Sequence, residues 1–126
     1  MRNLTKLFKS LGDNTNLRIL NLLFFSDQEL CVRELVDTLL ERQYNVSKHL
    51  AELLRLDLIR SRKEGRWVYY RLHNDRVLKQ LMEMVKSEIK TLVLAQDVNR
   101  LGKRLKLRQN GKCLIGIQNK NLFSKE

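Results

Sequence analysis

Two cysteines, Cys31 and Cys113, carry the most reactive side chains of this chain. The first residues lack the apolar centre of a secretory signal, so we expect a cytosolic protein, in which metal or redox chemistry is a better prediction than a structural disulfide. Cys31 is expected at a helix N-terminus beside Arg33, and Cys113 follows Lys112; both settings favour the thiolate. A C-terminal segment that folds back could bring the two thiols together. The alternative is that Cys31 acts only as a small, buried apolar side chain and that the Cys113 thiol has no function.

A second group of side chains is suited to reading the edges of DNA bases. All of them lie near the start of one predicted helix: Gln43, Tyr44, Asn45, Ser47, Lys48 and His49. Gln43 or Asn45 could form two hydrogen bonds with adenine, and Tyr44 could contact a thymine methyl group. His49 could donate to a purine acceptor; its alternative role is that of a surface residue that fills space beside the helix.

Cations follow this helix in a predicted hairpin. We expect four of them near DNA phosphates: Lys48, Arg62, Lys63 and Arg66. Gly65 allows a tight turn between the two strands. The formal net charge is +11 and the pI is about 10.1, so the partner is expected to be a polyanion, with nucleic acid as the first choice.

Hydrophobic periodicity indicates the elements that position these side chains. Helical spacing of apolar residues predicts helices over 4–11, 17–25, 32–40 and 43–56, the last with its apolar stripe from Val46 on; Asp13 is expected to cap the second helix, and Glu34 to complete a capping box with Cys31. Alternation then predicts strands over 58–62 and 67–72, and a long amphipathic helix follows over 77–93, capped by Asn74. The predicted fold is mainly α with a small β-hairpin, a winged helix-turn-helix in which the polar-fronted helix enters the major groove.

Residues 7–72 resemble the ArsR/SmtB family of metal-responsive bacterial repressors. The resemblance rests on segments such as Leu-Phe-Lys-Ser-Leu-Gly-Asp, Glu-Leu-Cys-Val-Arg-Glu-Leu, Val-Ser-Lys-His-Leu and Glu-Gly-Arg-Trp-Val-Tyr-Tyr-Arg-Leu. It implies a homodimer in which the long terminal helix and the first helix pair across a two-fold axis. Such a dimer would bind double-stranded DNA at an imperfect palindromic operator. The alternative is a terminal helix that folds back on its own subunit.

The resemblance also bears on the effector. In arsenical-sensing members the segment that matches residues 29–35 carries two cysteines; here Cys31 matches the first, and Arg33 occupies the second position. Cys113 is the only other thiol, so a dithiolate would need a third ligand that is not a thiol to hold trivalent arsenic. Residues 75–98 contain no histidine, so we do not expect the zinc-type site that other members build on the terminal helix.

The predicted function is a dimeric, sequence-specific transcriptional repressor that a thiophilic effector, such as arsenite or antimonite, releases from its operator. No cofactor is required, and the metal-site prediction is Cys31 with Cys113. One alternative is a repressor that responds to thiol oxidation or persulfidation, and another is a basic architectural nucleic-acid-binding protein without sequence preference. An enzyme is not expected, because the sequence has no phosphate-binding glycine loop and no catalytic arrangement of nucleophile, base and acid. We divide the chain into a DNA-binding and dimerisation domain, 1–98, and a basic C-terminal extension, 99–126.

Overall fold

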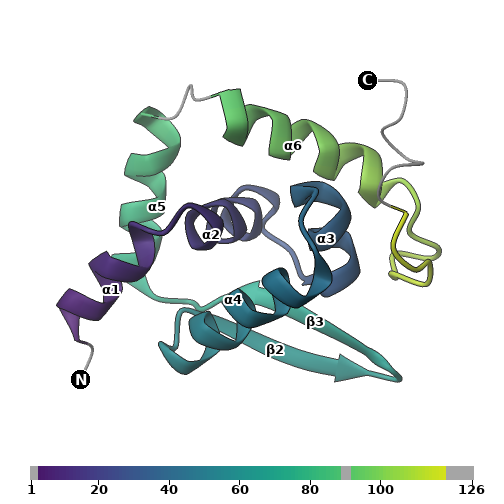
Figure 1. The fold of residues 1–126 in the computed structure, drawn as a ribbon, viewed down its shortest axis with the longest axis horizontal. Coiled ribbons are helices and arrows are strands. Elements are labelled where there is room, and N and C mark those ends of the chain that lie inside the picture. Colours follow the sequence, from purple (N-terminus) through teal and green to yellow (C-terminus); the bar gives the residue numbers. More distant parts are fainter. Residues whose placement is uncertain (1–2, 89–91, 119–126) are drawn as a thin grey trace.

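The computed structural model describes residues 3–88 and 92–118. Its helices and strands follow in the order α1 (Leu4–Leu11), α2 (Asn14–Ser26), β1 (Leu30–Cys31), α3 (Val32–Leu39), α4 (Gln43–Arg55), β2 (Ile59–Glu64), β3 (Trp67–Leu72), α5 (Arg76–Glu88) and α6 (Leu92–Leu105). In Figure 1 the helices α2 and α3 lie centrally, α4 and the hairpin of β2 and β3 lie below them, and α5 and α6 lie to the left and above. This arrangement confirms the predicted winged helix-turn-helix.

The core forms around α2, whose sequence is too apolar for a surface helix. Its Ile19, Leu20, Leu22 and Leu23 are almost fully buried. The stripes of α3 and α4 pack against them, because leucine and valine side chains recur there at helical spacing. The core therefore fixes which face of α4 is buried and which is left for a partner.

The three short strands form one antiparallel sheet in the order β1-β3-β2. The sequence predicted β2 and β3, although β2 extends further than expected, to Glu64. It missed β1, in which Leu30 and Cys31 pair with Tyr70 and Tyr69. Two residues are too few for periodicity to reveal, yet this strand sets the position of Cys31.

Two of the three predicted helix caps are confirmed. Asp13 accepts a hydrogen bond from the Asn16 amide at 2.9 Å, and Glu34 accepts one from the Cys31 amide at 3.1 Å. The cap predicted before α5 was wrong by one residue, because Asp75, and not Asn74, accepts from the Leu78 amide at 3.0 Å.

The single long terminal helix was also a wrong prediction. The structure has α5 ending at Glu88 and α6 beginning at Leu92, and residues 89–91 lie outside the described part. Helix α6 packs on α2 and α3, so it covers its own subunit. The predicted boundary between residues 98 and 99 falls inside α6. Within the described residues, no helix is long and apolar enough to cross a membrane.

Candidate nucleic-acid interface and thiol site

The first turns of α4 present a polar surface. Val46, Leu50 and Leu53 are buried on one side of the helix, so the remaining positions face outward. Of the predicted base-reading residues, Gln43, Tyr44 and Ser47 are exposed, Tyr44 to 80%. Asn45 is half-buried and donates to Glu41 at 3.2 Å. Lys48, predicted near phosphate, is exposed on the same helix.

His49 is the predicted contact that the structure places differently. Its Nδ1 atom donates to Asn16 Oδ1 at 2.7 Å and lies 3.6 Å from Asp13 Oδ1. The His49 side chain is only 13% exposed. It thus joins α4 to the start of α2, and its contact with DNA stays a prediction.

The wing is the hairpin of β2 and β3, closed by Gly65 and Arg66. Gly65 has a φ of +61°, a left-handed conformation that glycine adopts without strain. Lys63 and Arg66 are exposed at the wing tip, as predicted for residues near phosphate. The guanidinium of Arg66 lies 5.8 Å from the centre of the Trp67 ring, and that of Arg33 lies 3.7 Å from it. Stacking on Trp67 therefore links α3 to the wing.

Arg62 is engaged within the protein. It donates to both carboxylate oxygens of Glu29, at 2.9 to 3.1 Å. The hydrogen bond raises the pKa of Arg62 and lowers the pKa of Glu29, so both groups are held in their charged forms. A phosphate at this edge of the wing would compete with Glu29 for Arg62.

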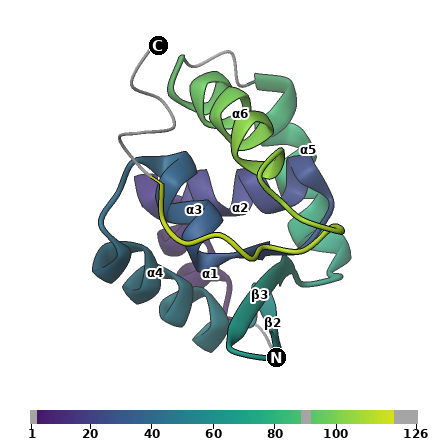
Figure 2. The same ribbon diagram turned by 90° about the vertical axis from the view of Figure 1, so that its right-hand side faces the viewer.

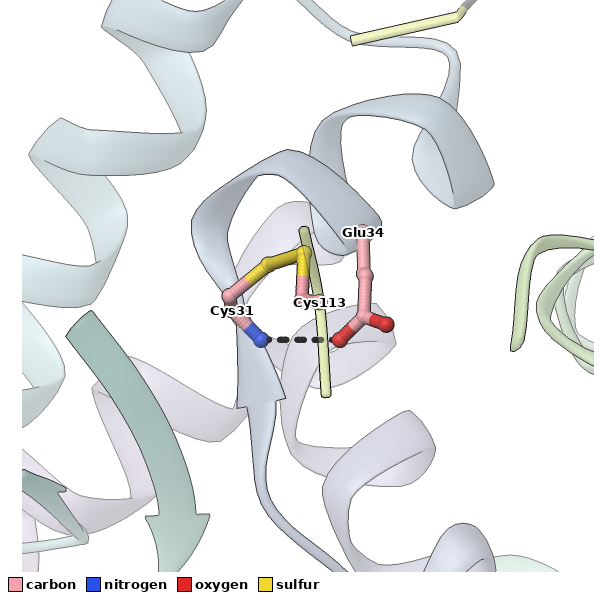
Figure 3. Close-up of side chains that lie close together, drawn as sticks. All are labelled: Cys31, Glu34 and Cys113. Carbon is pink, nitrogen blue, oxygen red and sulfur yellow. Dashed lines mark hydrogen bonds between the residues drawn. A yellow bond between two sulfur atoms is a disulfide. The ribbon is translucent and has the colours of Figure 1, made fainter. Parts of the chain in front are cut away.

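The two cysteines, 82 positions apart in sequence, are brought together. The structure joins Cys31 and Cys113 in a disulfide, with the Cα atoms 6.9 Å apart and both residues buried (Figure 3). Cys31 lies at the junction of β1 and α3, and the Cys113 amide donates to the Tyr69 hydroxyl at 2.9 Å. The C-terminal segment therefore folds back within one subunit.

Glu34 is the third polar group at this thiol site. Its carboxylate and the two sulfur atoms offer ligand atoms that all lie within 4.8 Å of one another. In the reduced state the site would offer two soft sulfur ligands and one harder carboxylate oxygen. This set fits a thiophilic ion that accepts one oxygen ligand. Glu34 is already engaged, because Arg108 donates to both of its oxygens at 2.7 Å. The sequence did not point to Glu34 as a ligand; its position one helical turn after Cys31 was the available signal.

A row of arginines docks the C-terminal segment on α3. Arg100 donates to the Thr38 carbonyl at 2.7 Å and to Asp97 at 2.9 Å. Arg104 donates to Asp37 at 2.6 Å, and both side chains are fully buried. Figure 2 shows the result, with α6 beside α3 and the yellow segment crossing in front of α3.

These arginines were read from the sequence as part of a basic extension. Arg100 and Arg104 are four residues apart, which is the spacing of one helical face, and this signal could have identified them as docking residues; Arg108 lies beyond the end of α6. The hydrogen bond that Arg108 donates to Glu34 raises the pKa of Arg108 and burial lowers it; the hydrogen bond prevails, so this pKa is raised. The segment that carries Cys113 is therefore anchored by buried charge pairs as well as by sulfur.

Comparison with known proteins identifies the fold family. Residues 13–61 match the family model described as bacterial regulatory protein, arsR family. The chain is 46% identical over 66 residues to the arsenic resistance transcriptional regulator ArsR1 of Pseudomonas putida, a match that covers 52% of this chain and 51% of that protein. It is 46% identical over 67 residues to the arsenical resistance operon repressor of Escherichia coli, covering 53% of this chain and 56% of that one. The matched part thus spans about half the length of these relatives.

Among solved structures, the transcriptional regulator HlyU from Vibrio vulnificus superposes with a TM-score of 0.61 at 36% identity. The match covers 67% of this chain and 84% of HlyU. All three proteins are named as transcriptional regulators or repressors, which confirms the prediction of a regulator rather than an enzyme. On this sequence and structural similarity, the chain belongs to the ArsR family of bacterial regulatory proteins.

Proposed function

We propose that this chain is a sequence-specific DNA-binding transcriptional repressor that acts as a homodimer. The observation that carries the proposal is the exposed polar surface at the start of α4, next to a wing whose tip exposes Lys63 and Arg66. Gln43, Tyr44 and Ser47 would contact base edges, and the cations would contact phosphates. Asn45 would first have to leave Glu41 to read a base.

Exposed apolar side chains support a dimer. On α1, Leu4 and Phe8 are exposed to 59% and 58%, and on α5 the exposed residues are Val77 and Met84. Leu4 and Val77 line the same cleft, which is also bordered by the end of α4. Pairing of two copies through α1 and α5 would remove these side chains from water and set two α4 helices on a palindromic operator.

The thiol site is proposed as the effector site. Reduced Cys31 and Cys113 would each displace one hydroxide of arsenous acid as water, forming two As–S bonds and retaining one oxygen ligand on arsenic. Antimonite would react in the same way. The site lies at the N-terminus of α3, and α3 packs against α4, so binding there can shift the position of α4. Coupling of this kind is typically about 1–3 kcal/mol.

A second candidate is a repressor that responds to oxidation of the same thiols. The observation in its favour is that Cys31 and Cys113 form a disulfide within one subunit. A peroxide would accept two electrons from the two thiols, giving the disulfide and, from hydrogen peroxide, two molecules of water.

One titration tests both candidates. A duplex selected from a random library is bound by the reduced wild type, by Cys31→Ser and by Cys113→Ser, each with arsenite, with hydrogen peroxide and without addition. If arsenite releases the wild type but neither variant, the arsenical effector is supported. If hydrogen peroxide, and not arsenite, releases the wild type but neither variant, oxidation is supported. If either agent releases both variants fully, the thiol site is not its sensor. If a scrambled duplex binds the wild type as tightly as the selected one at fixed salt, sequence-specific repression is wrong and a non-specific architectural role remains.

A further inference from the structure

A small turn in the C-terminal segment resembles a second hairpin tip. Gln109 and Lys112 exchange both backbone hydrogen bonds, at 2.9 and 3.0 Å, and Asn110 and Gly111 between them have φ values of +54° and +72°. Two positive φ angles in a row are typical of the tight turns that close β-hairpins, and Asn-Gly is the preferred sequence. The turn therefore has a defined shape.

This turn lies beside the wing. The Lys112 Nζ atom is 3.6 Å from Glu64 Oε1, and the Lys112 side chain is 54% exposed. A cleft of about 290 Å³ lies between the two hairpins, lined on one side by Arg62 and Tyr69 and on the other by Asn110 and Lys112. In Figure 1 the turn and the wing tip project on the same side of the molecule.

The cleft is bordered by Glu29 and Glu64 on the side of the sheet, and its basic side is the C-terminal segment. Residues 99–118 carry six cations and no acidic residue. The three arginines at 100, 104 and 108 are occupied by internal partners, whereas Lys112 faces the wing. Glu64 is the acidic residue of the segment 62–66, where it would repel a phosphate that approaches Lys63 or Arg66. The ammonium of Lys112 offsets that charge and adds a phosphate donor of its own.

Both ends of the turn are fixed to the rest of the protein. Arg108, just before it, is held by Glu34 at 2.7 Å. Cys113, just after it, is held by the disulfide to Cys31 and by the Tyr69 hydroxyl. Lys112 is thereby placed beside the wing before any DNA arrives, which lowers the entropic cost of the contact.

We propose that the turn Gln109–Lys112 is a second phosphate-contacting element, which binds the same DNA backbone as the wing and is held in place by Cys113. The inference rests on the proposed function, because it assumes that the wing approaches DNA. It also gives the thiol site an effect on DNA affinity that is opposite in sign to release by an effector: freeing Cys113 releases Lys112 from the wing and weakens this contact, without any movement of α4.

The test is the salt dependence of duplex binding by the full chain with the disulfide intact, on a duplex selected with that form of the protein. Lys112→Gln removes the proposed contact, and Lys106→Gln is the matched control, since Lys106 is an exposed cation of the same segment outside the wing cleft. We expect the slope of log K against log salt to become less steep by about 0.9 for each Lys112 that contacts a phosphate. Lys106→Gln should leave the slope as in the wild type.

Equal slopes for Lys112→Gln and Lys106→Gln would overturn the proposal, provided that the wild type binds the selected duplex. If the wild type itself does not discriminate between duplexes, the proposed function has failed instead. The anchoring role of Cys113 is tested in the Cys113→Ser background, where adding Lys112→Gln should change the slope little. A change as large as in the disulfide-bonded protein would refute the anchoring.

Discussion

The buried pair of Arg104 and Asp37 gives the sharpest prediction about how the C-terminal segment is held. Both side chains are fully buried, with Nε and Oδ2 2.6 Å apart. In Arg104→Met the carboxylate of Asp37 would still accept a hydrogen bond from the Gln118 amide, which lies 2.9 Å from both carboxylate oxygens. It would lose the positive charge of the guanidinium. Removing one partner of a buried ion pair costs about 3–5 kcal/mol. That is a large fraction of the roughly 5–15 kcal/mol that stabilises a typical domain.

We therefore expect Arg104→Met to lower the free energy of unfolding in urea by about 3 kcal/mol or more. If α6 detaches before the rest unfolds, the same loss appears as faster amide hydrogen exchange in α6, by a factor of about 100 or more. Lys106→Met is the control, because it removes the same charge from an exposed position and should change stability by about 0.5 kcal/mol or less. The combined variant Asp37→Leu with Arg104→Met should be more stable than either single variant, since it leaves no buried charge unpaired. An effect of Arg104→Met below about 1 kcal/mol in both measurements would refute the reasoning.

Three further predictions concern the proposed dimer surface, the wing and its support. Phe8→Glu should convert the proposed dimer into a monomer in sedimentation experiments. Phe25→Glu, on α2 and exposed to 50% against 58% for Phe8, should leave the dimer intact, and a dimeric Phe8→Glu would contradict the α1 and α5 interface. The pKa of Glu29, measured by NMR, should lie below the ordinary value of 4.5 and should rise in Arg62→Gln. Because folding lowers this pKa, the Glu29–Arg62 pair stabilises the protein above the pKa of Glu29 in the unfolded chain, and this stabilisation is lost as the pH falls through the pKa of Glu29 in the folded protein. Gly65→Ala should destabilise the protein by about 1 kcal/mol in urea, because alanine is strained at a φ of +61°, and an unchanged midpoint would contradict that conformation.

The thiol site and the wing share structural supports, so their properties are linked. Tyr69 of β3 contacts Cys113 through its hydroxyl, and its ring lies 5.1 Å from the Arg62 guanidinium. Glu34 accepts hydrogen bonds from both the Cys31 amide and the Arg108 side chain. A change at the sulfur atoms therefore reaches the hairpin within two side-chain contacts. This short path is the physical basis for proposing that Cys31 and Cys113 form an effector site that controls DNA binding.

The sequence by itself determined the elements whose formation depends on neighbouring residues. Apolar spacing predicted α1 over its full length, and the buried stripe through Val46 and Leu50 predicted which face of α4 stays exposed. Asp13 was identifiable as a helix cap because its partner lies three residues away. Alternation and Gly65 predicted the wing. Each of these signals lies within a short stretch of neighbouring residues.

Only the tertiary structure decided what distant residues do to one another. It pairs Cys31 with Cys113, turns His49 toward Asn16, and assigns Arg104 to a buried carboxylate instead of a nucleic acid. A cysteine, a histidine or an arginine has the same local preferences whether it faces a ligand, water or a buried partner. The choice depends on how segments up to 82 positions apart pack together, and that is fixed by the shape of the whole core rather than by local spacing.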